Sequence, residues 1–367
     1  MNQILEKSGL NIYAVILAGG RGERFWPRSR AGKPKQFTDL TGDGSMLYLT
    51  YRRSLLLAPP ERIFVVTGAE YREATRECLP DLPEENIVIE PEGRNTAPCI
   101  GLAAVVIEKR DPGGIMAVFP ADHLIKNTDK FRETMKTAAV LAETGEGLVT
   151  VGITPTRPET GYGYLKIGEK VAAGIGKTAY RVDRFVEKPG PELAQHYLDD
   201  GGYLWNAGIF VGKTSVILRE ISVYLPEMYA GLKEISNVVG KENYRQVLER
   251  IYPTFTRVSI DYGIMERAAG VFTVSGEFYW DDVGTWHALE RVFGTDDSGN
   301  VIKGKVISLN TKNSIIHSGE RMVAVIGAED MIIVETDDIT FVCHKKETDK
   351  VRELLEELRR LNMEEYL

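Results

Sequence analysis

The sequence contains few cysteines and no long apolar run. Its three cysteines, Cys78, Cys99 and Cys343, lie far apart and form no CxxC pair. This spacing argues against a disulfide framework and a structural zinc site, and it is typical of a reducing compartment. No stretch approaches the roughly 20 apolar residues that a membrane span needs. The N-terminal residues lack the basic start and cleavage site of a signal peptide. We therefore expect a cytoplasmic protein without a membrane segment.

Excess positive charge is also missing. The 367 residues carry a net charge of −8, whereas proteins that bind polymeric nucleic acid usually have a basic balance or a basic stripe. We therefore expect no polymeric nucleic acid as a partner. One segment is an exception, because only Glu23 opposes six cations there: Arg21, Arg24, Arg28, Arg30, Lys33 and Lys35. Such a segment is either a solvated basic loop or a site for a small polyanionic ligand.

The first two-thirds of the chain alternate short apolar runs with helical patterns. The apolar runs are 13–17, 63–66, 87–89, 115–119 and 148–151, and the helical patterns cover 45–57, 69–78, 95–108 and 128–143. Short runs that are apolar throughout are typical of strands in a sheet that is covered on both faces. The alternation predicts an α/β fold of Rossmann-like type, with a mostly parallel mixed sheet and helices on both faces.

The pattern changes after the polar segment 295–300, which we interpret as a linker. Residues 301–344 contain short β-branched runs without a helix signal. The last segment predicts a helix that packs its apolar face on the protein's own core. That face is formed by Val351, Leu354, Leu355, Leu358 and Leu361. We expect two domains: 1–294 with the main sheet, and 295–367 with a β-rich unit and the terminal helix.

A glycine-rich loop with the sequence AGGRGER, residues 18–24, follows the first apolar run directly. Glycines after a strand let backbone N–H groups approach phosphate oxygens. Two common phosphate-binding loops are nevertheless excluded. The dinucleotide fingerprint GxGxxG would need glycine at Phe25, and a Walker A loop would need glycine at Val171 or Ala207.

The longer string LAGGRGERFWPRSRAGKPKQF, residues 17–37, resembles the signature of the sugar-nucleotide pyrophosphorylase family. Its FWPxSR and PKQF elements resemble the mannose-1-phosphate guanylyltransferase branch. The resemblance implies that Arg24 and Lys35 grip a nucleoside triphosphate. It also implies that the loop lines the nucleotide, through Leu17, Ala18, Gly19, Gly20, Arg21, Gly22 and Glu23. Glu23 stands where many relatives have threonine, and its role stays open.

The segment EPEGRNTAP, Glu90–Pro98, opens a predicted helix. Asn95 or Thr96 can cap this helix by satisfying free backbone N–H groups. The segment also resembles the guanylyltransferase segment that lies against the nucleotide base, which implies that Arg94, Asn95 and Thr96 bind the nucleotide. Guanine offers N–H donors, so Glu90 or backbone carbonyls are candidate acceptors for the base.

Two aspartates are candidate Mg²⁺ ligands. Asp122 follows the run 115–119 in the motif PADH, and Asp282 lies in WDDVGTW. A carboxylate after a strand can hold a hard cation, because Mg²⁺ prefers oxygen ligands and phosphate partners. A single aspartate at such a position is also a common turn former. The resemblance implies that Asp122 and Asp282 are the metal ligands, while Asp281 faces elsewhere and His123 is structural.

The motifs ETGYGY, FVEKP and WNAGIF follow in the order of the family. They imply a sugar-phosphate site in which Gly161 and Gly163 bring backbone groups near the sugar. Glu187 and Asn206 would hydrogen-bond to sugar hydroxyls, and Lys188 would meet the sugar phosphate. Without the resemblance, the EKP segment would be an ordinary charged turn.

The resemblance implies a Mg²⁺-dependent enzyme that transfers GMP from GTP to mannose 1-phosphate, giving GDP-mannose and pyrophosphate. Two alternatives stay open: the same chemistry with another nucleotide or with another sugar 1-phosphate such as glucose 1-phosphate, and a non-catalytic sugar-nucleotide-binding paralogue. The paralogue would lack one of the expected functional residues, and all of them are present: Arg24, Lys35, Asp122, Lys188 and Asp282.

The last part of the chain resembles the short β-helix-like tail of this family. This tail is a candidate for homodimer contacts. Longer relatives carry an isomerase domain after it, and the sequence ends before such a domain. We therefore expect no isomerase activity.

Overall fold

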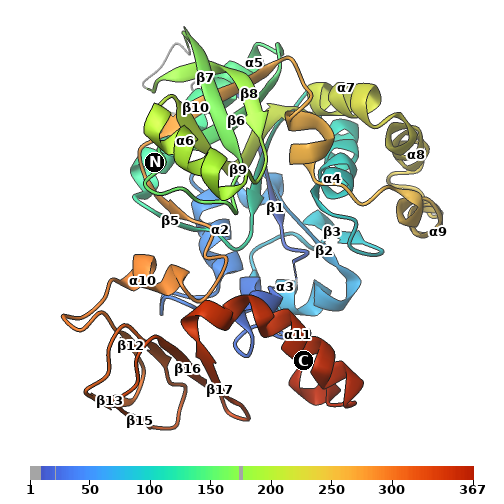
Figure 1. The fold of residues 1–367 in the computed structure, drawn as a ribbon. Helices are drawn as coiled ribbons and strands as arrows, with labels where there is room; N and C mark the ends of the chain where they lie inside the picture. The colour runs from blue at the N-terminus through green and yellow to red at the C-terminus, as the bar shows by residue number, and fades with distance from the viewer. Residues whose placement is uncertain (1–9, 21, 173–176) are drawn as a thin grey trace. The chain divides into compact units, whose positions relative to one another are not determined.

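The computed structural model describes residues 10–20, 22–172 and 177–367 (Figure 1). Within these ranges, none of the helices is both long enough and apolar enough to span a bilayer. The contacts between residues divide the chain into two compact units. We call them the sheet unit and the tail unit and describe each by itself.

The division does not follow the order of the chain. The sheet unit contains the chain up to Gly19, Leu47–Ala121 and Ile125–Trp280. The tail unit contains Gly20–Met46, Asp122–Leu124 and Asp281–Leu367. Most of the glycine-rich segment therefore belongs to the same compact unit as the C-terminal residues. The domain boundary after residue 294 stays a prediction.

A mixed β-sheet runs through the sheet unit, with the strand order β3-β2-β1-β4-β9-β6-β10-β8-β7 among the described residues. These strands are β1 (Ile12–Leu17), β2 (Ile63–Gly68), β3 (Ile87–Glu90), β4 (Ile115–Pro120), β6 (Leu148–Ile153), β7 (Tyr164–Val171), β8 (Ala179–Val186), β9 (Tyr203–Lys213) and β10 (Val271–Gly276). Parallel pairing joins β3, β2, β1 and β4, and also β6 and β10. Strand β9 runs antiparallel to β4 and to β6. The predicted α/β fold with a mixed sheet is confirmed.

Helices connect these strands. They are α2 (Met46–Ser54), α3 (Arg72–Cys78), α4 (Thr96–Arg110), α5 (Thr128–Glu143), α6 (Pro191–Asp200), α7 (Thr214–Tyr224), α8 (Pro226–Ser236) and α9 (Tyr244–Ile251). Side-chain caps fix where the two longest begin. Asn95 Oδ1 accepts from the backbone N–H of Thr96 at 2.8 Å, and Asn127 Oδ1 accepts from that of Lys130 at 3.2 Å. Such caps satisfy N–H groups that have no partner inside the helix.

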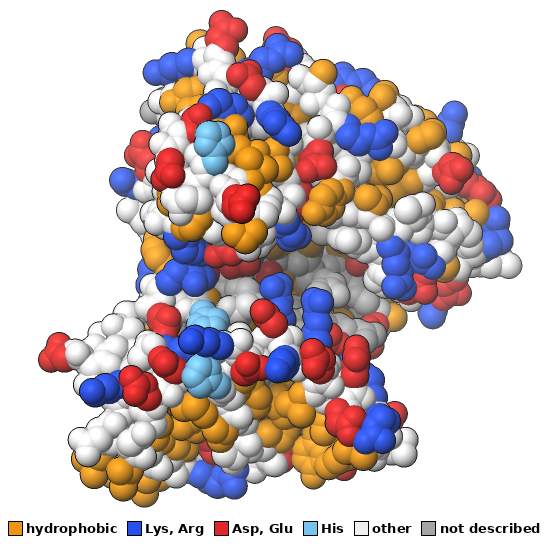
Figure 2. Space-filling model, viewed as in Figure 1, with side chains coloured by type: hydrophobic (Ala, Val, Ile, Leu, Met, Phe, Trp, Pro, Cys, Tyr) orange, Lys and Arg blue, Asp and Glu red, His pale blue; other side chains and the backbone are white. Residues whose placement is uncertain are grey.

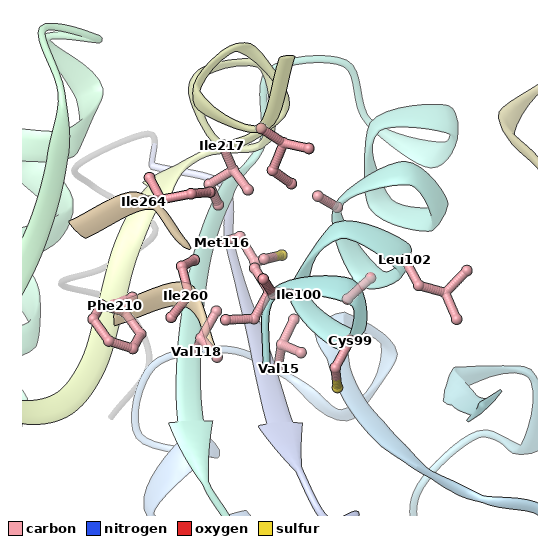
Figure 3. Close-up of a cluster of buried hydrophobic side chains, with 14 of the residues drawn as sticks. Val15, Cys99, Ile100, Leu102, Met116, Val118, Phe210, Ile217, Ile260 and Ile264 are labelled. Atoms are coloured by element: carbon pink, nitrogen blue, oxygen red, sulfur yellow. The ribbon is translucent and has the colours of Figure 1, made fainter. Parts of the chain in front are cut away.

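The side chains of β4 alternate between two covered faces. Met116 and Val118 lie in the apolar cluster of Figure 3, together with Ile100 of α4. Phe119 points to the other face, where its ring centroid is 5.8 Å from that of Phe131 on α5. Because successive residues of a strand face opposite sides, α4 and α5 cover opposite faces of the sheet. This double burial explains why the predicted strands are apolar throughout.

Stacked parallel strands form the β-rich part of the tail unit. Its elements include α10 (Ala288–Phe293), β12 (Val301–Lys303), β13 (Val306–Leu309), β14 (Ile315–His317), β15 (Val323–Ile326), β16 (Met331–Glu335), β17 (Thr340–His344) and α11 (Val351–Arg360). Strands β12, β14 and β16 pair in parallel, as do β13 and β15, so successive turns of the chain stack on one another. Ile315 and Ile332 face each other in register and are both fully buried. This arrangement confirms the predicted β-helix-like unit.

Two further short strands, β5 (Leu124–Lys126) and β11 (Tyr279–Asp281), contain residues of both units. The terminal helix α11 is present as predicted, but its apolar face is only partly covered. Val351 and Leu355 are buried, whereas Leu354 and Leu361 are 38% and 50% exposed. Helical spacing therefore identified the correct face, but it overestimated how much of that face packs on the unit.

Candidate active site

The backbone at the end of β1 is held by the neighbouring strands of the sheet unit. The N–H of Ala18 donates to the carbonyl of Val66 at 2.8 Å. A Cβ atom on Gly19 would lie 3.1 Å from Oε1 of Glu90, which is tighter than an ordinary carbon contact. Glycine thus lets the chain pass close to this buried carboxylate. Leu17, Ala18 and Gly19 form the part of the predicted nucleotide loop that belongs to the sheet unit.

The next part of the loop approaches Lys35 within the tail unit. Gly22 has φ +65°, in the left-handed region that favours glycine. A Cβ atom there would lie 2.5 Å from the Cβ of Lys35, so a side chain would displace one of the two segments. Gly20 has open space around it, and the predicted site residue Arg21 lies outside the described residues. Gly22 is the glycine that the close approach requires.

Glu23 and Arg24 point to different surroundings. Nη2 of Arg359, on α11, donates to Oε1 of Glu23 at 3.1 Å. Glu23 is thus paired with a cation of its own unit, which gives the carboxylate a structural role that the sequence left open. The Arg24 side chain is exposed and makes no ion pair with a described carboxylate. An exposed, uncompensated guanidinium is available to a polyanionic ligand.

Lys35 brings together the two aspartates that were predicted as metal ligands. It is only 3% exposed, and its Nζ donates to Oδ2 of Asp122 at 2.9 Å and to the backbone carbonyl of Asp282 at 2.7 Å. The same Nζ lies 5.6 Å from the ring centroid of Phe25. A buried ammonium in this setting requires nearby negative charge. All these groups belong to the tail unit.

The Asp122 carboxylate is charged at neutral pH. Partial burial would raise its pKa, but the positive charges of Lys35 and His123 and the hydrogen bond from Lys35 outweigh that cost and lower the pKa below its usual value. The side chain remains 39% exposed. An ionised and partly accessible carboxylate can still bind a further cation.

The two neighbouring aspartates of WDDVGTW have separate surroundings. Asp281 is buried, and its carboxylate accepts from Nε and Nη2 of Arg291 at 2.6 and 3.0 Å. Asp282 is less buried, and one of its carboxylate oxygens accepts from the backbone N–H of Gly284 at 3.1 Å. Asp281 therefore pairs with Arg291, and the Asp282 side chain is the less buried of the two.

The donor set fits magnesium. Among the described residues there is no group of three or more histidine, cysteine, aspartate or glutamate side chains arranged to hold a metal ion. Mg²⁺ does not need such a cage, because it usually binds one or two carboxylates, keeps several waters and completes its shell with substrate phosphates. Asp122 and Asp282, which contact the same ammonium, are the residues that could hold it.

Two other cations of the segment 21–35 make contacts within the tail unit. Arg30 is bound to Asp338 of the tail unit, and Nη2 of Arg28 donates to the backbone carbonyl of Asp39 at 3.4 Å. Arg30 is therefore paired within its own unit, and a polyanionic ligand for the segment stays a prediction.

A second cluster of predicted residues lies in the sheet unit. The Glu187 carboxylate is buried; its Oε1 pairs with Nζ of Lys188 at 3.0 Å, and its Oε2 accepts no hydrogen bond from a described residue. A Cβ atom on Gly163 would lie 2.4 Å from that Oε2. Burial raises the pKa of Glu187, although Lys188 opposes the shift. Gly161 is exposed, and its backbone N–H donates to Oε1 of Glu159 at 3.0 Å. The Oε2 atom is a candidate acceptor for a ligand hydroxyl.

Asn206 is oriented by its neighbours in the same cluster. Its backbone N–H donates to the carbonyl of Gly163 at 2.8 Å. Its Oδ1 accepts from Oγ1 of Thr150 at 2.7 Å, and its Nδ2 donates to Oδ1 of Asp261 at 2.9 Å. The structure thus brings Gly163, Glu187, Lys188 and Asn206 together, as the resemblance implied.

Asp261 is a functional candidate that the sequence did not reveal. Burial, followed by the negative charge of Glu187, raises the pKa of its carboxyl to about 7. Such a shift in a cluster of polar groups is typical of binding and catalytic sites. Asp261 begins a short π-helical segment, Asp261–Met265, a rare element that often occurs at functional sites. No motif in the sequence indicated that this aspartate would lie beside Asn206.

The residues predicted to bind the nucleotide base make internal contacts. The Arg94 guanidinium pairs with Glu92 and donates to the carbonyl of Phe255 at 3.2 Å. Asn95 caps α4, and Oγ1 of Thr96 accepts from the backbone N–H of Ile260 at 2.9 Å. The capping interpretation therefore holds for Asn95. The base-binding role of these three residues stays a prediction.

Glu90 is buried close to Gly19, where it contacts other polar side chains. Its Oε2 accepts from the hydroxyl of Tyr252, and the Cys99 thiol also hydrogen-bonds to the carboxyl. Burial raises the pKa of Glu90. Oε1 is the oxygen of this carboxyl that lies close to Gly19.

Comparisons with known proteins show which family the chain belongs to. The family model described as Nucleotidyl transferase matches residues 13–298, and the chain belongs to this class. A second model, described as MannoseP isomerase/GMP-like beta-helix domain, matches residues 304–358. The first match contains Lys35, Asp122 and Asp282, and the second covers the strands of the tail unit from β13 to β17.

Individual relatives define the family more closely. The chain is 37% identical to mannose-1-phosphate guanylyltransferase of Escherichia coli (strain K12) over 95% of its own length and 73% of that protein. It is 38% identical to the xanthan biosynthesis protein XanB of Xanthomonas campestris, with the same coverage. A Thermus thermophilus crystal structure described as "mannose-1-phosphate geranyltransferase" matches with a TM-score of 0.85 and 34% identity, over 95% of this chain and all of the other. The chain belongs to the mannose-1-phosphate guanylyltransferase family of nucleotidyltransferases.

Proposed function

We propose that the chain transfers GMP from GTP to α-D-mannose 1-phosphate, giving GDP-mannose and pyrophosphate. The observation that carries the proposal is the position of one buried ammonium, Lys35, which contacts the carboxylate of Asp122 and the backbone carbonyl of Asp282. Such a group of charges suits a reaction between two polyanions, whose main obstacles are mutual repulsion and the charge of the transition state. Membership of the family supports the choice of substrates.

The transfer step is an in-line displacement. A phosphate oxygen of mannose 1-phosphate forms a bond to the α-phosphorus of GTP, and the bond from that phosphorus to the oxygen bridging to the β-phosphate breaks. The electron pair leaves with pyrophosphate. The attacking oxygen is already anionic at neutral pH, so no side chain has to remove a proton. Positioning and charge stabilisation by this chain's residues therefore carry the rate enhancement.

Mg²⁺ is the proposed cofactor, held by Asp122 and Asp282, and when bound it would neutralise phosphate charge. Lys35 and Arg24 contribute fixed positive charge to the triphosphate. The resemblance to the family assigns the loop from Leu17 to Glu23 to the phosphates. The exposure of Arg24, which pairs with no described carboxylate, supports this assignment. For the base, Oε1 of Glu90 is the proposed acceptor from guanine.

The cluster of the sheet unit binds the sugar phosphate. Oε2 of Glu187, which lacks a hydrogen-bond donor among the described residues, accepts from a mannose hydroxyl, and Asn206 and Asp261 bind further hydroxyls. Nζ of Lys188 pairs with the phosphate of mannose 1-phosphate. Its 54% exposure supports this role, because a ligand phosphate can reach it.

We also propose a cytoplasmic location and a homodimer. The structure describes all three cysteines, and no disulfide joins them, as expected in a reducing compartment. The paired strands β13 and β15 expose Ile307, Leu309 and Ile326, and hydrophobic side chains gather over the strands of the tail unit in Figure 2. An exposed apolar sheet face favours association. Light scattering on the purified protein tests whether it is a dimer, and Ile326→Glu should shift a dimer toward the monomer.

One assay tests the proposed reaction. Pyrophosphate release is measured with Mg²⁺ for five nucleoside triphosphates, each combined with the 1-phosphates of mannose, glucose and N-acetylglucosamine. GTP with mannose 1-phosphate should give the highest kcat/KM. A higher value for another pair would contradict the substrate assignment, and no release with any pair would contradict the reaction itself.

A further inference from the structure

Arg30 lies in the segment 17–37, after the glycine-rich loop. It is bound by the turn between β16 and β17 in the same unit. Its Nη1 donates to Oδ2 of Asp338 at 2.7 Å, and its Nη2 donates to Oδ1 of Asp338 and to Oγ1 of Thr336. Asp338 lies between β16 and β17 and also accepts from Oγ1 of Thr336 at 3.1 Å. Two parallel hydrogen bonds to a planar guanidinium fix its orientation as well as its position.

Arg30 also belongs to a second turn, residues 30–33, which leads along the backbone to Lys35. The N–H of Arg30 donates to the carbonyl of Lys33, and the N–H of Lys33 donates to the carbonyl of Arg30, both at 3.1 Å. Nε of Arg30 donates to the carbonyl of Pro27 at 3.1 Å. The chain leaves this closed turn at Lys33, and Lys35 follows two residues later. Arg30 therefore fixes the turn 30–33, which directly precedes Lys35 in the chain.

Trp26 supplies a second attachment of the same segment. Its Nε1 donates to the carbonyl of Tyr366 at 2.7 Å, and its own carbonyl accepts from Nε1 of Trp286 at 3.1 Å. Its ring meets Phe341 of β17 edge-on, with 5.5 Å between centroids. The segment that leads to Lys35 is thus fixed to the C-terminal part of the chain at two places, Trp26 and Arg30.

We infer that Asp338 is a positioning residue for nucleotidyl transfer, because through Arg30 it holds the turn that places Lys35 against Asp122 and Asp282. The inference rests on the proposed function, which assigns Lys35 to the nucleotide phosphates. It gives the β-helix-like segment a part in the reaction. Asp338 comes from the segment matched by the beta-helix model, while Lys35 comes from the segment matched by the Nucleotidyl transferase model.

The Arg30–Asp338 pair orients the Arg30 side chain but adds little to the folding free energy. The side chains of Arg30 and Asp338 are 20% and 44% exposed, and ion pairs of this exposure add little to folding free energy. The hydrogen bond from Arg30 lowers the pKa of Asp338 to about 2, so the carboxylate is ionised at neutral pH. Loss of the pair should therefore move Lys35 while leaving the fold intact.

Steady-state kinetics of three single variants and one double variant test this inference. Asp338→Asn removes the charge, Arg30→Lys keeps the charge but removes the bidentate geometry, and Glu320→Gln is the matched control, because Glu320 pairs with Lys305 on the surface of the same unit. We expect Asp338→Asn and Arg30→Lys to lower kcat about 10-fold or more, since small displacements of a catalytic group are costly. The KM for mannose 1-phosphate should stay within about 2-fold, because that substrate is assigned to the other cluster. Glu320→Gln should match the wild type.

The double variant Arg30→Lys/Asp338→Asn should be no slower than the slower single variant, because both changes break one pair. An unchanged kcat in Asp338→Asn, or a loss that appears only together with a lower unfolding midpoint, would overturn the inference. Amide hydrogen exchange keeps this test separate from the proposed function. The amides of Arg30 and Lys33 should exchange faster in Asp338→Asn than in the wild type or Glu320→Gln, even if no substrate pair is turned over. Unchanged exchange would also overturn the inference.

Discussion

Gly22 and Lys35 approach each other so closely that a methyl group on Gly22 would lie 2.5 Å from the Cβ of Lys35. Real carbon atoms do not come this near without displacement. Gly22 and Lys35 are therefore packed directly against each other. A change in the loop backbone is transmitted to the ammonium that contacts Asp122 and Asp282.

Gly22→Ala should consequently impair catalysis by moving Lys35. The substitution also places a side chain at φ +65°, which is strained for residues other than glycine. We expect kcat to fall by about 10-fold or more, since misplacing a preorganised charge is costly. Gly32→Ala is the matched control, because Gly32 lies in the same segment with nothing within 4 Å of its Cβ position. Equal activity of the two variants would contradict the packing argument.

Asp281→Asn should affect stability rather than chemistry. The substitution leaves the Arg291 guanidinium without its bidentate carboxylate partner. We expect a loss of about 1–3 kcal/mol in the free energy of unfolding, as for other broken buried hydrogen bonds. Urea denaturation measures the loss. The folded fraction should keep most of its turnover, and a variant with wild-type stability but no activity would reverse the assignment of Asp281 and Asp282.

The pH dependence of stability should reveal Asp261. Its folded-state pKa of about 7 lies above the ordinary value of 3.8, so between these values the native state binds more protons than the unfolded state. Stability therefore falls as the pH rises through this window, because the buried carboxyl must ionise. Asp261→Asn cannot ionise, so its unfolding free energy should improve relative to the wild type across this window. A constant difference between the two proteins would contradict the shift.

Lys188→Met should weaken binding of the sugar phosphate alone. The variant loses the cation that we assign to the phosphate of mannose 1-phosphate, while Lys35 and Arg24 are unchanged. We expect the KM for mannose 1-phosphate to rise about 10-fold, as for loss of one charge-assisted contact, with little change in the KM for GTP. Lys213→Met, which removes a lysine paired with Glu143 in the same unit, is the control. A similar rise in both KM values would argue against the assignment.

Much of the fold could be predicted because local patterns determine it. The helical pattern 128–143 coincides with α5 (Thr128–Glu143), and the first apolar run coincides with most of β1 (Ile12–Leu17). The reversed direction of β9 could not be predicted in this way. Strand direction depends on which strands pair, and Ile115 of β4 pairs with Lys213, almost a hundred residues away.

The same limit explains what was missed in the site. Arg24, Lys35, Asp122 and Asp282 could be named from motifs, because each lies in a compact segment that resembles the family. Charge alone could not separate Arg30 from these residues, since its partner Asp338 is about three hundred residues later in the chain. Asp261 carried no recognisable motif, and the hydrogen bond from Asn206 and the charge of Glu187 show that it belongs to their cluster.

Magnesium dependence of turnover tests the central claim most directly. Pyrophosphate release from GTP and mannose 1-phosphate is followed after chelation and then during titration with Mg²⁺, for the wild type, Asp122→Asn, Asp282→Asn and the double variant. We expect chelation to stop pyrophosphate release by the wild type, and added Mg²⁺ to restore it. Each single variant should release pyrophosphate at least about 100-fold more slowly at saturating Mg²⁺, as for loss of a preorganised charge. Near-normal turnover of a correctly folded double variant would contradict the account.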